Sequence, residues 1–324
     1  MADNRKSCQR VSHRNMALAV LLVPLLLETS SAATYPNVAL RGKATQIFCD
    51  HGLGDAYNAI DGNRDSAFHH GSCTHNAAST NPWWRVDLLD AYVVTSVSVT
   101  NRGDCCPERL DRLQIYVGNS KENNGLQNAK VAAIRSIRGG ATHTERFTDR
   151  VEGRYVTLSL PGTQRTLTVC EVEVYGYRAP TGENLALQGK ASQSSLFSYG
   201  IPYSAIDGNP DSSWEAGSCS HTNNDINPWW RLDLRRTHKV FSVAVTNVDA
   251  NPERLQGAEI RIGDSLENNG NDNPRCGVIK NIAAGAVSEF RCNGMDGRYV
   301  NVVIPDREEF LSLCEVEVFG AVLD

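Results

Sequence analysis

"NPWWRVDL", residues 81–88, recurs as "NPWWRLDL" at residues 227–234. After the second tryptophan of each copy, apolar and polar residues alternate, as in a β-strand with one buried face. Turn-rich spacers separate further stretches of this kind, and no amphipathic helical pattern is evident. The pattern therefore predicts an all-β fold, an antiparallel sandwich or barrel. The other stretches that alternate or are rich in Val, Ile and Thr are "VTSVSVT" (94–100), "LQIYV" (113–117), "RYVTLSL" (154–160) and "CEVEVYG" (170–176).

The repetition extends over most of the chain. "AIDGNRDS" (59–66) returns as "AIDGNPDS" (205–212), and "PERL" (107–110) returns at 252–255. Two copies with so long a period indicate tandem globular domains rather than a solenoid. We place the domains at residues 34–178 and 184–324, joined by a linker, "APTGE" (179–183), that contains Pro and Gly.

The N-terminus has the pattern of an export signal. Basic residues precede the apolar run "MALAVLLVPLLL" (16–27), and small residues follow it. The run is too short to span a bilayer. We predict that residues 1–33 are a signal peptide and that the mature protein is secreted and extracellular. An uncleaved membrane anchor is the alternative, and either Met1 or Met16 could be the start.

Composition narrows the classes of partner. The formal net charge is −5 and no long Lys/Arg run occurs, which argues against nucleic acid binding. No other apolar run approaches spanning length, so we expect no membrane insertion. The chain has ten cysteines, which fits an oxidising compartment, and they lack the paired CxxC spacing of a zinc site.

The stretch "TNRGDCCPERL" (100–110) concentrates unusual chemistry. Arg102 and Arg109 offer only donors, and Asp104 between them can hold an arginine in place. With His75 they fit a sugar hydroxyl, which accepts hydrogen bonds and also donates one. The alternative is a surface salt-bridge cluster. The Arg-Gly-Asp tripeptide also occurs in integrin ligands. A match of three residues is too common to indicate that role, and its Arg and Asp have another use here.

Cys105 and Cys106 are adjacent. They could each pair with a distant cysteine, or with one another in a vicinal disulfide. Neighbouring Cα atoms lie about 3.8 Å apart, below the usual disulfide separation. A vicinal bond would make a stiff apolar ridge against which the C–H face of a sugar could pack.

His75, Arg102, Asp104 and Arg109, in this order and spacing, resemble the sugar-binding signature of the F-type lectins, which bind L-fucose. The segments "NPWWRVDL", "HGSCTH" and "CEVEV" are similar to that family too. The resemblance covers nearly all of 37–176 and, more loosely, 184–320. It implies a jelly-roll β-sandwich in each domain, in agreement with the strand pattern.

The resemblance also implies roles in the first domain. One histidine and two arginines would hydrogen-bond the axial hydroxyl, a neighbouring hydroxyl and the ring oxygen of L-fucose. An aspartate would orient an arginine, the vicinal disulfide would touch the sugar, and two aromatic residues would shelter its methyl group. Ordinary packing is the alternative for the aromatic residues. The residues concerned are His75, Arg102, Arg109, Asp104, Cys105, Cys106, Phe68 and His69.

The second domain matches this signature only in part. It keeps the histidine and the second arginine, as His221 and Arg254, but has Val248 in place of the first arginine. Asp249 is an approximate match to the aspartate, Trp214 takes the phenylalanine position, and both adjacent cysteines are absent. Losing a charge-assisted hydrogen bond predicts roughly ten- to a hundredfold weaker fucose binding. This domain either binds another sugar or serves as a spacer or assembly unit.

A structural Ca²⁺ ion in each domain is a further implication of the resemblance. The stretch "DGNRDS" lacks the later residues of an EF-hand, so we reject that motif. Without the resemblance, a turn in which Asp61 caps its own backbone would be preferred. The implied ligands are Asn58, Asp61, Asn63, Ser72, Cys170 and Glu171 in the first domain, and Ser204, Asp207, Asn209, Ser218, Cys314 and Glu315 in the second.

The resemblance implies four disulfides: Cys73–Cys170, Cys105–Cys106, Cys219–Cys314 and Cys276–Cys292. Removal of Cys8 with the signal peptide leaves an odd number of cysteines. Cys49 is left over. It could be free, could join two chains, or could displace one member of the vicinal pair.

The sequence thus predicts a secreted, Ca²⁺-stabilised lectin, not an enzyme, that binds fucosylated glycans on cell or microbial surfaces. The family suggests agglutination in innate immunity, and a homo-oligomer is possible because weak single sites gain from avidity. One alternative is a carbohydrate-binding module of a glycosidase system, although paired catalytic carboxylates are not apparent. The other is a discoidin-like membrane or phospholipid binder, which the acidic charge disfavours.

Overall fold

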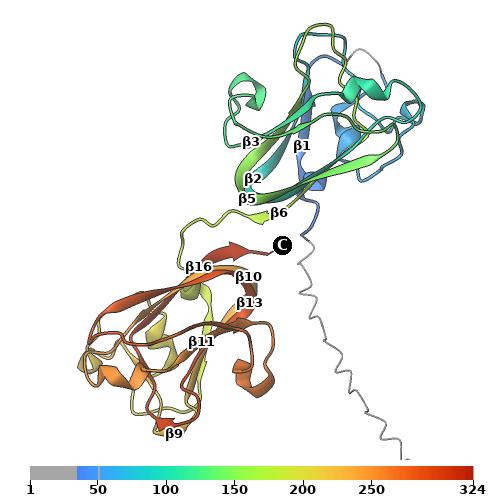
Figure 1. Ribbon diagram of the computed structural model, residues 1–324. Coiled ribbons are helices and arrows are strands. Elements are labelled where there is room, and N and C mark those ends of the chain that lie inside the picture. Colours follow the sequence, from blue (N-terminus) through green and yellow to red (C-terminus); the bar gives the residue numbers. More distant parts are fainter. Residues whose placement is uncertain (1–34, 50–51, 324) are drawn as a thin grey trace, which may run out of the picture. The chain divides into compact units, whose positions relative to one another are not determined.

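The computed structural model describes residues 35–49 and 52–323 (Figure 1). The expected signal peptide (1–33) and Cys8 lie outside the described residues. Within these ranges the regular elements are β-strands and short 3-10 helices. None of the helices in this part of the chain is long and apolar enough to cross a membrane.

Six strands of the first domain form one antiparallel sheet. Their order is β1-β2-β5-β3-β4, and β6 pairs with the other part of β2. The strands are β1 (Lys43–Gln46), β2 (Trp83–Thr100), β3 (Leu113–Gly118), β4 (Ala129–Ile134), β5 (Thr142–Ser159) and β6 (Glu171–Arg178).

The long strand β2 builds both layers of the sandwich. Residues 83–87 pair with β5 and include the partners of β1, whereas residues 92–100 pair with β5 and β6. The register shifts between Asp87 and Tyr92. Such an irregularity lets one strand bend and pass from one layer to the other. The two stretches that the sequence predicts as strands, 84–88 and 94–100, are therefore the two halves of β2.

The second domain repeats this topology, with order β12-β11-β13-β10-β16 and β7 beside β10. No regular element occupies residues 179–184, which include the expected linker. The main strands are β7 (Lys190–Gln193), β10 (Trp229–Thr246), β11 (Glu259–Gly263), β12 (Arg275–Val278), β13 (Val287–Val303) and β16 (Glu315–Val322). Two short pairs join β8 (Ser220–His221) to β15 (Ser312–Leu313) and β9 (Asp225–Ile226) to β14 (Glu308–Glu309).

The repeated tryptophans anchor each core. Trp84 is fully buried, and its indole N–H donates to the Ala56 carbonyl at 2.9 Å. Trp230 is likewise buried and donates to the Pro202 carbonyl at 3.0 Å. A buried indole needs such a partner. The bonds tie the segments before β2 and β10 to the sheets, and the two β-sandwiches confirm the expected all-β fold.

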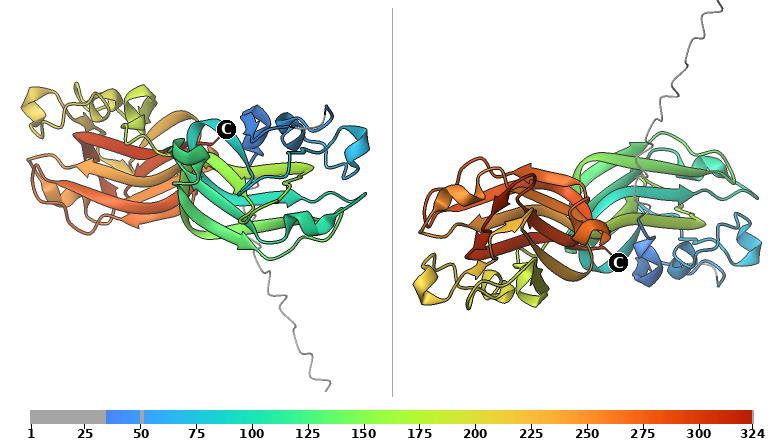
Figure 2. Two further views of the ribbon diagram at one scale, coloured as in Figure 1. Left: turned by 90° about the horizontal axis from the view of Figure 1, so that it is seen from above. Right: turned by 90° about the horizontal axis from the view of Figure 1, so that it is seen from below.

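Short 3-10 helices shape the connecting loops. Figure 2 shows that the segment containing η1 to η3 lies along one side of the first-domain sheet. The helices are η1 (Val38–Arg41), η2 (Ala56–Ala59), η3 (Phe68–His70), η4 (Pro107–Leu110), η5 (Glu122–Gly125), η6 (Leu185–Gln188), η7 (Pro202–Ala205), η8 (Trp214–Ala216), η9 (Pro252–Leu255) and η10 (Glu267–Gly270).

All four expected disulfides are present: Cys73–Cys170, Cys105–Cys106, Cys219–Cys314 and Cys276–Cys292. Cys49 is exposed and belongs to none of them. The alternative in which Cys49 displaces a member of the vicinal pair is therefore wrong, because those two sulfurs bond to one another.

Candidate functional site

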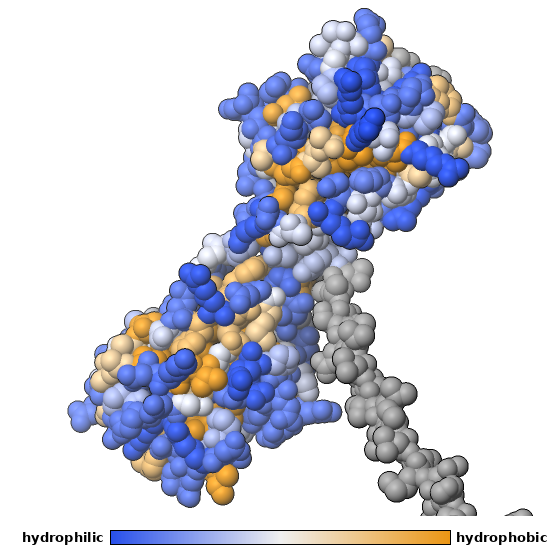
Figure 3. All heavy atoms as spheres, viewed as in Figure 1, coloured by the Kyte–Doolittle hydropathy of each residue, from blue (hydrophilic) through white to orange (hydrophobic). Residues whose placement is uncertain are grey.

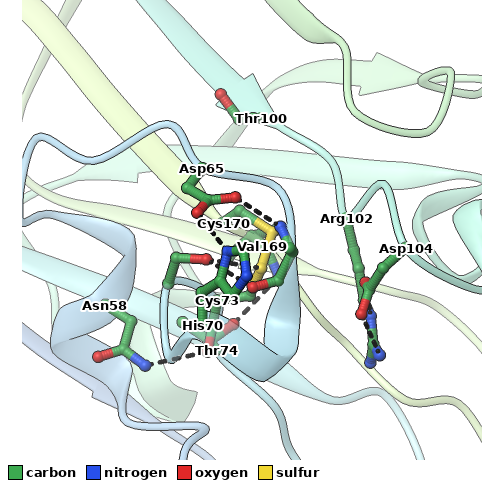
Figure 4. Close-up of a disulfide and its surroundings, with 12 residues drawn as sticks. Asn58, Asp65, His70, Cys73, Thr74, Thr100, Arg102, Asp104, Val169 and Cys170 are labelled. Carbon is green, nitrogen blue, oxygen red and sulfur yellow. Dashed lines mark hydrogen bonds and ion pairs between the residues drawn. A yellow bond between two sulfur atoms is a disulfide. The ribbon is translucent and has the colours of Figure 1, made fainter.

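Arg102 is fixed between a carboxylate and an aromatic ring. Its Nε and Nη2 donate to the two oxygens of Asp104 at 2.6 and 3.2 Å, as Figure 4 shows. Its guanidinium carbon lies 4.5 Å from the centroid of the buried Phe68 ring. The hydrogen bonds from Arg102 hold the pKa of Asp104 well below its usual range. The pair is thus ionised at neutral pH, and the guanidinium has further N–H groups to offer a ligand.

The other two expected residues adjoin this pair. Arg109 Nη1 donates to His75 Nε2 at 3.3 Å, and the rings of His75 and Phe68 are 5.3 Å apart. Phe68 therefore lies next to both Arg102 and His75. The fold brings together residues from η3, the loop that follows it, the loop before η4 and η4 itself, which is the convergence that the sequence predicts.

Backbone constraints shape the loop between the arginines. The Gly103 N–H donates to the Ser66 carbonyl at 2.8 Å, and a Cβ at position 103 would lie 2.5 Å from the Ser66 hydroxyl. Only glycine fits without displacing Ser66. Cys106 is left-handed, with φ of 56°, and precedes η4. The Cys105–Cys106 bond cross-links the residues immediately before the helix that carries Arg109.

Sequence reasoning missed the residues that position His75. The Gly54 carbonyl accepts from the His75 N–H at 3.1 Å and from Gln46 Nε2 at 2.7 Å. A side chain on Gly54 would place its Cβ 2.7 Å from the His75 Cβ. The signal that could have found them is the glutamine of β1, which recurs in β7: Gln193 makes the corresponding bond to the Gly200 carbonyl at 3.1 Å.

His69 lies at the rim of the site. Its side chain is 67% exposed, and its Nδ1 is 3.4 Å from Asp104 Oδ2. His70 instead contacts Asp65 at 2.7 Å. Phe68 is the inward residue of η3. The structure therefore places Phe68 against Arg102 and His75, and His69 beside Asp104.

The second domain builds the same position from apolar side chains. Trp214 begins η8 as Phe68 begins η3. Val248 is buried in a small cluster with the Cys219–Cys314 disulfide, against which Trp214 packs. The cation–aromatic pair of the first domain is therefore replaced by an apolar contact.

Asp249 does not occupy the place of Asp104. Its N–H donates to the Ser212 carbonyl at 3.0 Å, as the Gly103 N–H does to Ser66. Asn251, with φ of 53°, takes the left-handed position of Cys106. Ala250 alone therefore stands where the first domain has Asp104 and Cys105, so the approximate match of Asp249 to Asp104, made from spacing, is corrected: Asp249 is the equivalent of Gly103.

His221 and Arg254 remain at the second site. The Nδ1–H of His221 donates to the Thr222 carbonyl at 2.7 Å, because a carbonyl can only accept. Burial lowers the pKa of His221, and nearby Arg254 lowers it further. The Arg254 guanidinium lies 4.7 Å from the Phe310 ring centroid and 3.8 Å from Glu309.

A second cluster in the first domain consists of oxygen atoms. Asp61 Oδ1 accepts from the Asn63 N–H at 2.8 Å, and the Gly62 N–H donates to Glu171 Oε1 at 3.1 Å. The other oxygen of Glu171 is buried without a hydrogen-bond partner. Burial raises the pKa of Glu171 to about 8, and the Asp61 charge adds to the effect. An unpaired buried carboxylate oxygen beside a second acid suits a cation with hard oxygen ligands.

The second domain repeats this arrangement. Asp207 accepts from the Asn209 N–H at 2.9 Å, and the Gly208 N–H donates to Glu315 at 3.3 Å. Glu315 also has one buried oxygen without a partner. Burial raises its pKa to about 7, with Asp207 contributing.

The remaining expected ligands would act through oxygens other than carboxylates. Asn58 uses its amide N–H group to donate to the carbonyls of Leu53 and Cys73 at 2.7 and 3.0 Å, which leaves only its oxygen atoms for an ion. Ser72 and Ser218 donate from their hydroxyls to backbone carbonyls. In the described ranges no three His, Cys, Asp or Glu side chains gather as a metal cluster. An ion would therefore need amide, hydroxyl or backbone oxygens as well.

The fold and its loop site define a galactose-binding-like β-sandwich domain that occurs twice. Residues 58–158 and 204–302 match the model of the NedA-like, galactose-binding domain. The chain belongs to the F-type lectin, or fucolectin, family.

Three relatives carry this assignment. Fucolectin-1 of Anguilla japonica is 48% identical over 48% of this chain and 93% of its own length. The fucolectin of Anguilla anguilla is 50% identical over 44% of this chain and 91% of its own length. The crystal structure of a fucolectin from striped bass (Morone saxatilis) serum is 66% identical, covers 90% of this chain and 99% of that chain, and superposes with a TM-score of 0.87.

Proposed function

We propose that this protein is a secreted lectin that binds terminal L-fucose through its first domain, without turning the sugar over. The observation that carries the proposal is the position of Arg102, fixed between Asp104 and Phe68 next to the His75–Arg109 pair. The relatives named as fucolectins, one of them from serum, support both the sugar and the extracellular location.

The chemistry of this cluster suits a deoxy sugar. The two guanidinium groups donate to ring and hydroxyl oxygens, and His75 can exchange a hydrogen bond with one hydroxyl. Phe68 and the Cys105–Cys106 ridge offer apolar surface to a methyl group or a C–H face. The ion pair with Asp104 holds Arg102 in place before the ligand arrives, which reduces the entropy lost on binding.

We also propose that each domain holds one Ca²⁺ ion. In the first domain Asp61 and Glu171 would neutralise it, with oxygens of Asn58, Asn63, Ser72 and Cys170 completing the set. In the second domain the equivalent residues are Ser204, Asp207, Asn209, Ser218, Cys314 and Glu315. When bound, the ion supplies the positive charge that would balance the buried carboxylates, each of which has one oxygen without a partner. It would fix the loop that leads to Ser66, whose carbonyl holds Gly103.

Titration calorimetry of the full chain with methyl α-L-fucoside, in Ca²⁺, tests the proposal. Arg102→Ala should weaken binding at the first site about 10- to 100-fold, because a charge-assisted hydrogen bond is lost. Arg41→Ala is the matched control, since Arg41 is exposed in η1. Equal affinities for the wild type and Arg102→Ala would refute the assignment of this residue.

We propose that the biological role of this site is to bind glycans on cell surfaces. Single sugar sites are weak, and two sites in one chain, or several chains in an oligomer, would gain by avidity. Microbial or other cells that carry fucosylated glycans would then be agglutinated. This agglutination would serve innate defence.

A further inference from the structure

The second domain contains a small pocket at the position that corresponds to the first-domain cluster. Its volume is about 150 Å³, well below the roughly 300–1,000 Å³ of pockets for drug-sized ligands. A single monosaccharide is therefore the largest sugar that it could enclose. The lining residues are Trp214, His221, Val248, Ala250, Asn251, Arg254 and Ser312.

Three polar groups converge on this pocket. His221 and Ser312 are direct partners in the β8–β15 pair. The Nδ1–H of His221 is used by the Thr222 carbonyl, so the other ring nitrogen is an acceptor in the neutral imidazole. The Ser312 hydroxyl is buried without a hydrogen-bond partner, in a residue that is only 2% exposed. Arg254 also lines the pocket and supplies further donors.

An unpartnered hydroxyl of this kind points to a ligand. A buried polar group without a hydrogen bond is costly and calls for an explanation. One hydroxyl that lines a pocket, beside one acceptor and one guanidinium, matches the mixed donors and acceptors of a sugar edge. The second pocket therefore keeps the features of a binding site rather than those of a filled-in remnant.

The remaining wall consists of apolar side chains. The Trp214 ring stacks on Tyr199, with centroids 4.6 Å apart and an angle of 14° between the planes. Val248 is 4% exposed and packs in the same cluster as Trp214. In the first domain this wall is the guanidinium of Arg102 on Phe68, with the carboxylate of Asp104 behind it.

The replacement of Arg102 by Val248 changes which group of a sugar can face this wall. A free sugar hydroxyl directed at Val248 and Trp214 would lose its water and gain no hydrogen bond, which is unfavourable. A methyl ether at that oxygen has no proton to satisfy and adds apolar surface to bury. The same methyl group in the first domain would meet a charged guanidinium.

We propose that the second-domain pocket binds an O-methylated 6-deoxyhexose, in which a methyl ether replaces one of the hydroxyls that the first domain requires free. This inference rests on the proposed function of the family site as a monosaccharide pocket. The two domains of one chain would thus distinguish free from capped forms of similar sugars.

The test uses a full-chain variant that carries both Arg102→Ala and Arg109→Ala, which disable the first site. All measurements are made in Ca²⁺. The probes are methyl α-L-fucoside and its 2-, 3- and 4-O-methyl ethers, and dissociation constants are measured by calorimetry or saturation-transfer NMR. We expect at least one ether to bind about tenfold more tightly than the parent fucoside. If the parent binds as well as every ether, or if none of the four binds at millimolar concentration, the inference is overturned.

A second variant ties the preference to the wall. Val248→Arg, added to the same background, should remove the advantage of the ether. Trp214→Ala should abolish binding of that ether, and retention of full affinity by Trp214→Ala would contradict the assignment. The wild-type titration with the parent fucoside separates the two proposals, because it reports the first site. Loss of the ether preference leaves that site intact, whereas absence of fucoside binding by the wild type refutes the proposed function.

Discussion

At the scale of single residues, the position of Arg102 and Val248 separates the two domains. Arg102 places a cation on Phe68 and pairs with Asp104. Val248, at the same point of the second domain, packs against Trp214. Because a hydrogen bond to a charged group stabilises a complex by about 1.5–3 kcal/mol, this exchange alone would weaken the binding of a free hydroxyl in the second pocket.

Asp104→Asn should weaken fucoside binding at the first site about fivefold, since the partly exposed ion pair that orients Arg102 is lost. The ratio of the variant and wild-type dissociation constants should stay constant from pH 7 to pH 5. The depressed pKa of Asp104 means that its contribution is present above its ordinary pKa of 3.8 and is lost only below that value.

Calorimetry of both proteins at several pH values measures this ratio. Asp111→Asn, at the half-buried C-cap of η4, is the control for removing a nearby acid. A ratio that approaches one at pH 5 would show that Asp104 has already gained its proton, contrary to the account.

The sequence predicted the first-domain cluster well because its residues follow one another in a fixed order along the loops. It could not place Asp249. A one-residue deletion can fall at several points of a loop, and only the hydrogen bond to Ser212 shows that Asp249 stands where Gly103 does. The roles of Gln46 and Gly54 were also hidden, because they act through backbone carbonyls.

At the scale of elements, the glutamates at the starts of β6 and β16 join strands to loops. Glu171 and Glu315 are both buried, and each holds one backbone N–H of the loop opposite. Each also has an oxygen without a partner in this structure. The loops they hold lead to Ser66 and Ser212, which accept hydrogen bonds from the sugar-site loops.

Removal of Ca²⁺ with a chelator should lower the melting temperature of each domain by roughly 5–10 °C. A ligand at a hundred times its dissociation constant stabilises by about 2.7 kcal/mol, and each kcal/mol shifts the midpoint of a domain of this size by a few degrees. Differential scanning calorimetry with and without Ca²⁺ measures the shift.

Glu171→Gln should remove the Ca²⁺ response of the first domain, and Glu315→Gln that of the second. Glu152→Gln is a control, because Glu152 pairs with Arg150 outside the oxygen cluster. A melting curve that is unchanged by Ca²⁺ in the wild type would contradict the proposed metal sites.

The Cys276–Cys292 bond links β12 to β13 and has no counterpart in the first domain. By register, Val131 and Phe147 take the two positions there and pack against the core. Replacing both cysteines by serine should destabilise the second domain by about 3 kcal/mol. Hydrogen exchange should then be faster in β11–β13 and unchanged in β3–β5, and uniform protection in both domains would contradict this.

Strand alternation allowed the main strands to be predicted, because each has one face in a core. The short strands β1 and β4 were not predicted, since four to six residues carry little periodic signal. The bend within β2 was also missed. It depends on a register shift between paired strands, which the sequence of one strand does not contain.

At the scale of the whole molecule, the chain carries two candidate sites that are lined by different side chains. Exposed apolar side chains occur in both domains, including Phe48, which is 80% exposed, and Leu196, which is 51% exposed. Figure 3 shows hydrophobic residues on one face of the molecule among hydrophilic ones. Such residues can contact the apolar faces of a glycan, but they are also what a membrane-binding sandwich would use.

Co-sedimentation with liposomes separates these uses. We expect no binding to liposomes that contain only phosphatidylcholine and phosphatidylserine, since the net charge of −5 gives no attraction to an anionic surface. Liposomes that carry a fucosylated glycolipid should bind and be released by free L-fucose. Sedimentation with the unglycosylated liposomes that fucose cannot reverse would favour the membrane-binding alternative.

The most direct test of the central claim is a crystal structure of the full chain with Ca²⁺ and methyl α-L-fucoside. We predict the sugar in the first domain, with oxygens hydrogen-bonded to Arg102, Arg109 and His75 and with its apolar surface against the Cys105–Cys106 bond. A fucoside bound elsewhere while these three side chains make no contact with it would contradict the account.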